Sequence, residues 1–301
     1  MDKLRAMQVF STVARAGSLS AAAREMDTPL TNVSRQLSQL EQHLGVALIT
    51  RSARRMELTP EGREYLTACR LIIDDIDQAE ARISGQISDL NGTITITAPE
   101  TFGKIHVLPI VTDFLEQHSN IDIRLLLQDR RIDMIEEGVD LAVRIGALRD
   151  SGHLATFIGS QRMVTCAAPS YLAQHPAPQK PSDLNNHVCI CFAAPPSGLR
   201  WTYDHSEHGR KTIRVRPRLT VNSAEAAVGA AVNGLGITRV IGYQAADAIA
   251  KGLLVPVISN ADNTEIPVNI LRWPNRTAPR RVTAFIEFAS ARLRSNTHAA
   301  F

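Results

Sequence analysis

A chain of 301 residues is long enough for roughly two domains with ample buried core, and its 44% apolar and 5% aromatic content is ordinary for an α/β protein. The net charge of +3 is too small to indicate nucleic-acid binding by itself. The sequence holds neither an apolar run long enough to cross a bilayer nor the apolar core of a signal peptide, which predicts a cytoplasmic protein without a membrane partner.

The N-terminal segment is predicted to form three short helices. The first shows an apolar stripe with helical spacing and is broken at Gly17, and Ser18 then provides a hydroxyl cap for a short, alanine-rich second helix. Only Asp27 separates that helix from the start of the third, where Pro29 suits the first helical position. The third helix ends at Gly45. This spacing predicts the tight turn of a helix-turn-helix.

The polar face of the third helix carries short or forked hydrogen-bonding side chains and has no acidic residue before Glu41. A solvated helix face normally mixes Glu and Lys, whereas Arg and Asn suit base edges and small hydroxyls suit phosphates. Two short strands then flank an arginine-rich tip, which is either a solvated turn or, as we expect, a wing that grips phosphate or the minor groove. The predicted DNA contacts are Ser18, Thr28, Pro29, Thr31, Asn32, Ser34, Arg35, Ser38, Arg51, Arg54 and Arg55.

A long helix is predicted from Thr59 to about Ser88, and it carries one narrow apolar seam. A sustained seam of this spacing is typical of a helix that pairs with another helix, although the helix could instead pack on its own domain. Pairing would bring two recognition helices to two half-sites of a dyad-symmetric operator. The predicted dimer contacts are Tyr65, Cys69, Ile72, Ile76, Ala79 and Ile83.

The remaining two-thirds of the chain alternates predicted strands and helices. A βαβαβ order predicts a parallel sheet with helices on its faces. A second unit begins near Met163, and the last strand and helix are expected to return to the first unit. The elements predicted for the first unit are a strand over 92–99, a helix over 105–118, a strand over 121–127, a short helix over 132–137 and a strand over 140–146.

The N-terminal block resembles the LysR-type transcriptional regulators. The matching motif residues are Val33-Ser34-Arg35-Gln36-Leu37, Leu40-Glu41, Leu44-Gly45, Leu48, Arg51, Arg54-Arg55 and Leu58-Thr59-Pro60-Glu61-Gly62. The chain departs from the family at Leu30, where many members have a base-contacting Gln, and at Ile49, where Phe is usual. We therefore assign base reading at this end of the helix to Thr31 and Asn32.

The resemblance implies an α/β fold class with an all-α-type head. It implies a winged helix-turn-helix domain (1–58), a linker and dimerisation helix (59–88) and an effector-binding domain (89–301) of two Rossmann-like subdomains of the periplasmic-binding-protein type, with subdomain I at about 92–161 and 267–295 and subdomain II at about 162–266. The implied function is sequence-specific transcriptional regulation modulated by a small-molecule effector. The implied partners are double-stranded DNA, the effector and further copies of the chain as a dimer and tetramer, with RNA polymerase as an additional candidate. No cofactor, metal ion or enzymatic activity is expected.

The effector site is expected between the two subdomains, because ligands of α/β folds bind at the carboxyl ends of strands. By family resemblance, the loops after four strands line this cleft. Arg144 could clamp a carboxylate, but it could equally be structural, because its motif is general in the family. The predicted effector contacts are Pro99, Glu100, Thr101, Phe102, Gln128, Arg144, Ile145, Asn222 and Ser223.

Other classes of function are less well supported by the sequence. Gly234-Leu235-Gly236 lacks the third glycine and the preceding strand of a dinucleotide fingerprint, and no Walker loop or nucleophile elbow is present, which disfavours an enzyme. An architectural DNA-binding protein with a vestigial sensor is a third reading. The four cysteines lack zinc or thioredoxin spacing, and Cys189 and Cys191 share one strand face. They are interpreted as buried thiols, with redox sensing as the alternative.

Overall fold

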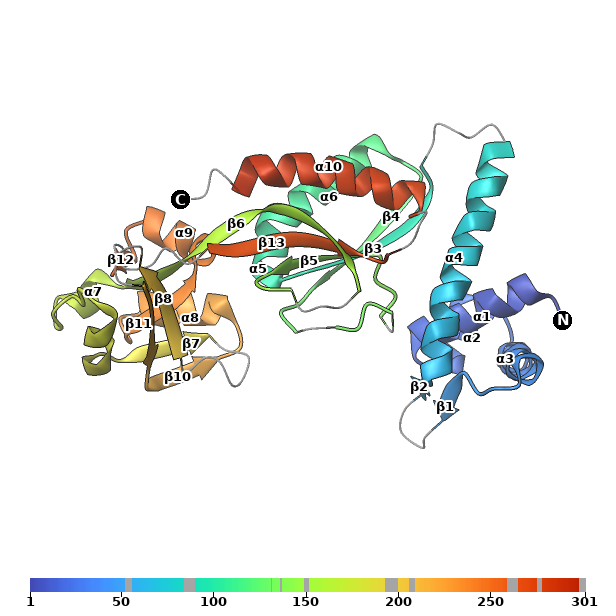
Figure 1. The fold of residues 1–301 in the computed structure, drawn as a ribbon, viewed down its shortest axis with the longest axis horizontal. Helices are drawn as coiled ribbons and strands as arrows, with labels where there is room; N and C mark the ends of the chain where they lie inside the picture. The colour runs from blue at the N-terminus through green and yellow to red at the C-terminus, as the bar shows by residue number, and fades with distance from the viewer. Residues whose placement is uncertain are drawn as a thin grey trace.

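The computed structural model describes all residues except 52–55, 84–89, 131, 136, 149–151, 193–199, 206–208, 259–264, 275–277 and 298–301. Figure 1 shows a small helical head, a long helix beside it and an elongated two-lobed α/β region. The head contains α1 (Lys3–Ala16), α2 (Leu19–Glu25), α3 (Leu30–Leu44), β1 (Ile49–Arg51) and β2 (Met56–Leu58), and the long helix is α4 (Pro60–Ile83).

Local capping explains where the helices of the head begin and end. Asp2 caps α1 by accepting from the Arg5 amide at 3.1 Å, and Ser18 caps α2 by accepting from the Ala21 amide at 3.1 Å. Gly17 ends α1 in the left-handed region, with φ 68°. The turn between α2 and α3 places Asp27 at φ 44°, a conformation that Asp tolerates better than most residues. The predicted helix-turn-helix is therefore present.

The third helix begins one residue later than the sequence suggested. Pro29 occupies the N-cap position of α3 rather than its first turn, and α3 has no side-chain cap. The Thr28 hydroxyl does not accept from the helix amides; it donates to the Met26 carbonyl at 3.0 Å. Thr28 therefore stabilises the turn rather than the helix end.

The first lobe is built on a sheet whose core includes Ile94, Ile96, Phe102 and Phe114. Its helical layer is continuous from Glu100, five residues earlier than predicted, and includes one π-helical turn. The predicted short helix over 132–137 is absent from the described part of this segment, which forms turns. The Asp133 carboxylate accepts from the Ile135 amide at 2.8 Å, a local turn that competes with helix formation. The elements are β3 (Gly92–Ala98), α5 (Glu100–Phe102), η1 (Gly103–Val107), α6 (Leu108–Gln117), β4 (Ile121–Leu127) and β5 (Leu141–Ile145).

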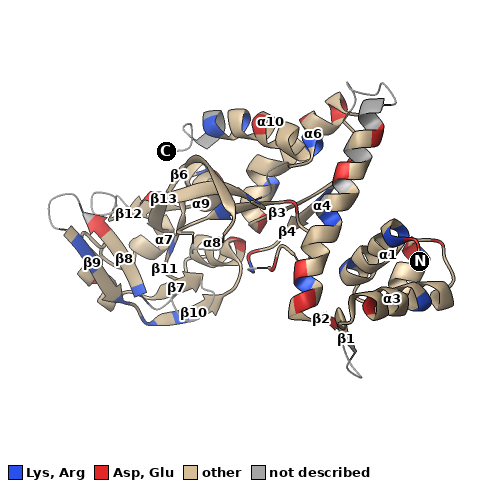
Figure 2. Ribbon diagram, turned by 45° about the vertical axis from the view of Figure 1, so that its right-hand side comes forward, with Lys and Arg blue, Asp and Glu red and all other residues tan. Residues whose placement is uncertain are grey.

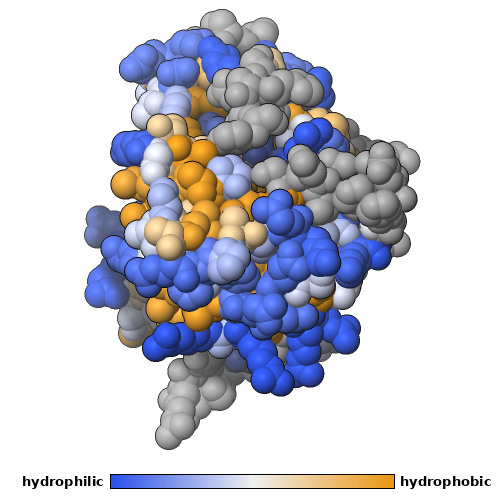
Figure 3. All heavy atoms as spheres, turned by 90° about the vertical axis from the view of Figure 1, so that its left-hand side faces the viewer, coloured by the Kyte–Doolittle hydropathy of each residue, from blue (hydrophilic) through white to orange (hydrophobic). Residues whose placement is uncertain are grey.

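The second lobe follows one long strand out of the first lobe. Seen from its end in Figure 3, its surface shows a hydrophobic area bordered by hydrophilic side chains. Its elements and the shared strands are β6 (Leu154–Ala167), α7 (Pro169–Leu172), η2 (Pro181–Asn186), β7 (Cys189–Phe192), β8 (Arg200–His205), β9 (Gly209–Arg214), β10 (Pro217–Val221), α8 (Ala224–Val232), β11 (Ile237–Ile241), α9 (Gly242–Ala250), β12 (Val255–Val257) and β13 (Glu265–Arg272). The last helix, α10 (Arg280–Thr297), packs in the core of the first lobe.

The two lobes share one continuous run of strands, in the order β10-β7-β11-β6-β13-β5-β3-β4. Pairing is parallel at the outer strands of both lobes, as predicted, but β6 and β13 run antiparallel to their neighbours, so the sheet is mixed. The predicted return of the last strand is confirmed, because β13 pairs with β5. Strands β6 and β13 therefore form the connection between the lobes (Figure 1).

Candidate nucleic-acid interface and ligand pocket

The outer face of α3 presents the polar side chains that the sequence singled out. Thr31, Arg35 and Ser38 are exposed, and Asn32 and Ser34 are half-buried beside them. The Arg35 guanidinium donates to the Asn32 side-chain oxygen at 3.1 Å. This hydrogen bond fixes the direction of the guanidinium and leaves further donors on its fork for a base edge or phosphate.

The other predicted DNA contacts lie in different surroundings. The Ser18 hydroxyl is occupied as the cap of α2, and the Thr28 hydroxyl accepts from Arg5 at 3.4 Å. Pro29 and Leu30 are exposed at the beginning of α3, Leu30 by 47%. Arg54, Arg55 and the side chain of Arg51 lie outside the described residues.

Glu41 positions the wing, a role that the sequence reading missed. Its carboxylate accepts from the Leu48 amide at 2.9 Å and from the Ile49 amide at 3.2 Å. Both of these residues are buried, so the two amides have little access to water. The acidic residue that ends the polar face of α3 therefore ties this helix to the first strand of the wing.

The predicted apolar seam of α4 divides into two parts. Cys69 is fully buried in the core of the head, and Tyr65 packs against the same core with its ring 5.8 Å from that of Phe10. Cys69 therefore cannot contact a partner helix. Further along α4, Ile72 is 40% exposed and Ala79 is exposed, with Ile76 half-buried between them. Ile83 lies at the end of α4, and its side chain is outside the described residues.

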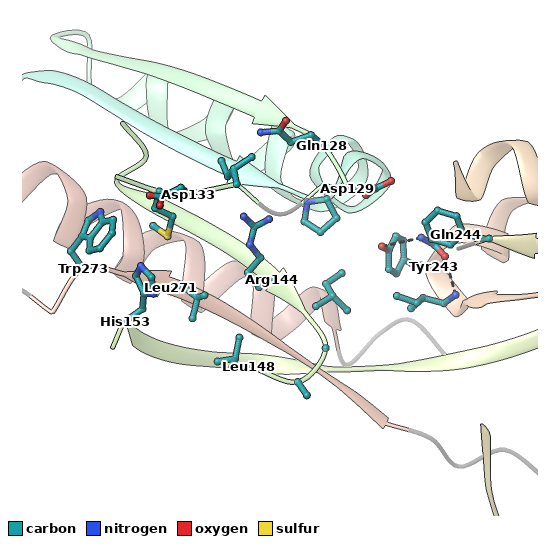
Figure 4. A pocket seen from close by; sticks show the side chains of 18 of the residues that line it. Gln128, Asp129, Asp133, Arg144, Leu148, His153, Tyr243, Gln244, Leu271 and Trp273 are labelled. Atoms are coloured by element: carbon teal, nitrogen blue, oxygen red, sulfur yellow. Dashed lines mark hydrogen bonds between the residues drawn. The ribbon is translucent and has the colours of Figure 1, made fainter. Parts of the chain in front are cut away.

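A cavity of about 570 Å³ lies at the carboxyl ends of β3, β4 and β5 and extends to the second lobe. Figure 4 shows Arg144 near its centre with Gln128 above it, His153, Leu271 and Trp273 at one end, and Tyr243 and Gln244 at the other. The lining residues are Pro99, Gln128, Asp129, Ile132, Asp133, Met134, Ile135, Arg144, Ile145, Gly146, Ala147, Leu148, His153, Phe192, Ile241, Tyr243, Gln244, Leu271 and Trp273.

The predicted effector contacts are only partly brought together. Pro99, Gln128, Arg144 and Ile145 line the cavity. The other five predicted contacts do not line it. Phe102 is fully buried in the first lobe, Thr101 is half-buried and Asn222 is exposed. The Ser223 hydroxyl caps α8 by accepting from the Ala226 amide at 3.4 Å, and the Glu100 carboxylate accepts from Lys104 at 3.0 Å.

Several lining residues were missed by the sequence reading. Tyr243 and Gln244 follow β11, so the rule that ligands bind at the carboxyl ends of strands could have identified them. Burial, followed by the nearby Asp129 charge, raises the pKa of Tyr243, so its hydroxyl stays protonated. Trp273 follows an antiparallel strand, and its indole donates to the Val139 carbonyl at 3.1 Å. No motif in the sequence indicated this position.

The segment from Ile132 to Val139 touches both the cavity and the head. Ile135 lines the cavity and also packs against the hydrophobic core of the head. Gly138 lies so close to Arg70 that an added Cβ would be 3.0 Å from the guanidinium. Ile132 lines the cavity as well, but it packs against a different cluster inside the first lobe.

All four cysteines are buried and free. Burial raises the pKa of the Cys69, Cys166 and Cys189 thiols to about 12 and that of Cys191 to about 11. In the part of the chain that the structure describes, no helix is long and apolar enough to cross a membrane, and no group of three His, Cys, Asp or Glu side chains is arranged to hold a metal ion.

A winged helix-turn-helix head joined to a two-lobed α/β domain with a pocket at its strand ends defines a DNA-binding regulator with a small-molecule-binding domain. Residues 4–63 match the family described as bacterial regulatory helix-turn-helix protein, lysR family, and residues 88–294 match the LysR substrate binding domain. The chain belongs to the LysR family of transcriptional regulators.

Similar proteins cover nearly the whole chain. The uncharacterized regulator YhjC of Escherichia coli (strain K12) is 32% identical over 292 residues, which span 96% of this chain and 97% of YhjC. The solved structure of CrgA from Neisseria meningitidis is 28% identical, with a TM-score of 0.62, and covers 96% of this chain and 98% of its own. The full-length Vibrio cholerae activator AphB is 26% identical, with a TM-score of 0.61 and the same coverage.

Proposed function

We propose that α3 reads the operator through Arg35, Asn32 and Thr31, with Ser34 and Ser38 on the flanking phosphates and with Ser18, Thr28 and the wing arginines beside them. The observation that carries this proposal is the Asn32–Arg35 hydrogen bond on the exposed face of α3. An oriented guanidinium with spare donors suits bidentate recognition of guanine.

Footprinting on the DNA upstream of the protein's own gene tests this proposal. Arg35→Ala should weaken specific binding by about 1–3 kcal/mol and relax the preference at one position of each half-site. Gln39→Ala, an exposed neighbour on α3, is the matched control and should keep the footprint. An unchanged footprint for the Arg35 variant would rule out this reading of the helix.

The exposed half of the α4 seam is proposed as the dimer contact, with dimers pairing further into a tetramer. The support is the exposure of Ile72 and Ala79 beyond the part of α4 whose Leu66 and Cys69 are buried in the head core. A dimer places two copies of α3 on a dyad-symmetric operator. Light scattering should show Ile72→Asp with Ile76→Asp as a monomer, whereas Glu80→Gln should leave the oligomer unchanged.

The 570 Å³ cavity is proposed as the effector site, with Gln128 and Arg144 as polar contacts. Its mixture of a central arginine, amide groups and an aromatic end suits a small amphipathic metabolite. A thermal-shift screen of metabolites tests this assignment, since a ligand of this site should lose its stabilising effect in Arg144→Ala. Recovery of the ligand unchanged after incubation distinguishes a regulator from an enzyme.

The effector is proposed to act on the head through Ile135, because this side chain lines the cavity and packs against the head core. Ile135→Ala should keep effector binding but remove most of the effector's influence on DNA affinity, a coupling typically worth about 1–3 kcal/mol. Ile132→Ala is the matched control, because Ile132 lines the same cavity without contacting the head core. Equal coupling in the two variants would refute this route.

On the promoter, the protein is proposed to change transcription through RNA polymerase and to reside in the cytoplasm on the nucleoid. The support is membership of a family of transcriptional regulators together with the DNA-binding head. Purified polymerase, the promoter and the protein, with and without the effector, give a direct transcription assay. A tagged copy should colocalise with DNA in cells.

A further inference from the structure

A row of arginines on the second lobe has no role in the function proposed above. From the end of β9 into β10, exposed Arg214, Arg216 and Arg218 alternate with the buried or half-buried residues Ile213, Val215, Pro217 and Leu219. Exposed Arg200 on β8 lies directly opposite Arg214. We call these four arginines the basic strip: Arg200, Arg214, Arg216 and Arg218. Figure 2 shows the blue segments following β9 towards β10.

The arrangement of the basic strip is not explained by the stability of the lobe. Like charges directly opposite each other on neighbouring strands destabilise a sheet, and Arg200 faces Arg214 in this way. Further along the hairpin, Arg210 lies opposite the acidic residue Asp204, whereas Arg214 lies opposite another arginine. Among the described residues, no ion pair joins any of the four arginines to a carboxylate.

We propose that the basic strip binds the phosphate backbone of duplex DNA flanking the operator. Arg214 ends β9, Arg216 lies between the strands and Arg218 belongs to β10. Alternate residues of extended chain lie about 6.6 Å apart, so neighbouring guanidinium groups can reach different phosphates. The exposed hydroxyls of Thr212 and Thr220 lie among the arginines and suit phosphate contacts. An acidic protein partner is less well matched, because protein interfaces centre on buried aromatic and apolar anchors.

The position of the strip in the molecule favours the same partner. In Figures 1 and 2, β10 and the wing strands β1 and β2 both lie at the lower side of the molecule. The contact of Ile135 with the head core joins the head to the first lobe, which is continuous with the second lobe through β6 and β13. DNA held by the head could therefore extend towards the strip, and a bend would bring it closer.

The inference rests on DNA binding by the head, so the test separates the two surfaces. Affinity is measured against salt concentration on a short duplex that holds only the footprinted operator and on a long duplex that includes its flanks. The strip variant carries Arg214→Gln, Arg216→Gln and Arg218→Gln. The control variant carries Arg162→Gln, Lys251→Gln and Arg292→Gln, which removes the same charge from exposed ion pairs elsewhere on the sensor.

On the long duplex, the strip variant should lower the salt slope by about 2.7 per protomer, since each phosphate contact contributes about 0.9. Its affinity should fall at least tenfold there, for operator and non-operator flanks alike, and remain unchanged on the short duplex. The control variant should match the wild type on both. The melting temperature of each variant shows whether it is folded. The strip variant should melt no lower than the wild type, because the like-charge pair of Arg200 and Arg214 is removed.

Two results with DNA would overturn the proposal. One is a salt slope on the long duplex that is the same for the wild type and the strip variant. The other is an equal loss in the strip and control variants, which would show a general effect of net charge. In either case, specific binding of the short duplex that is lost in Arg35→Ala would leave the proposed function of the head intact. A third result would also overturn it: if the wild type binds polyglutamate in preference to DNA and only the strip variant loses this binding, the strip fits an acidic protein partner instead.

Discussion

Removing the Glu41 carboxylate should release the wing from α3. In Glu41→Ala, the Leu48 and Ile49 amides lose the acceptor that lies 2.9 and 3.2 Å away. Leaving one buried amide without a partner costs about 1–3 kcal/mol of stability. Loss of the acceptor for both amides should therefore cost roughly 2–4 kcal/mol, when partial access to water is allowed for. In Glu41→Gln, one neutral oxygen still accepts, so about half of that loss is expected.

Hydrogen exchange of peptides that span 47–58 measures this effect directly. A loss of about 2 kcal/mol should speed the exchange of these amides roughly thirtyfold, since 1.4 kcal/mol corresponds to a factor of ten. DNA affinity should fall as well, because the wing tip is no longer held beside α3. Glu64→Ala, an exposed residue on α4, should change neither property. Unchanged exchange in Glu41→Ala would refute the role assigned to this carboxylate.

Three further predictions concern titratable side chains. With their pKa values raised to about 11–12 by burial, the cysteine thiols should react with an alkylating reagent at pH 8 only after unfolding, and fast labelling of the native protein would favour the redox alternative. Burial lowers the pKa of His106 and His153, so the unfolded chain binds more protons, and the melting temperature should fall as the pH drops below about 6.5. His106→Gln should reduce that fall. Tyr243→Phe should weaken effector binding without unfolding the lobe, as thermal shift with and without ligand would show.

The sequence predicted the head well because its signals are local. Ser18, Gly17 and Gly45 act within one or two turns of their own position, and the observed caps follow them. The one-residue error at Pro29 arose because Thr28 bonds back to the turn instead of forward to the helix. The role of Glu41 was missed because the two amides that donate to its carboxylate lie seven and eight residues away, beyond any helical repeat.

The candidate pocket was only partly predictable, for a related reason. Gln128 and Arg144 end strands, so a rule about strand ends identified them. Ser223 obeys the same rule, but its hydroxyl is used as a helix cap. Trp273 follows a strand more than a hundred residues after β5, and its place in the cavity that Arg144 lines depends on antiparallel pairing that the alternating pattern did not reveal. Burial of Cys69 in the head likewise depends on a tertiary contact that the seam spacing leaves open.

The cavity draws residues from both lobes, and this constrains how a ligand could act. Arg144 and Trp273 belong to the first lobe, whereas Tyr243 follows β11 in the second. Among the described residues, only β6 and β13 carry the strand pairing between the lobes, and there β6 contains Gly159 at φ 148° beside a register shift in β13. A ligand that touches both Arg144 and Tyr243 would restrain motion about this crossing. Because Ile135 lines the same cavity and packs on the head, restraint of the lobes and displacement of the head would be two consequences of one binding event.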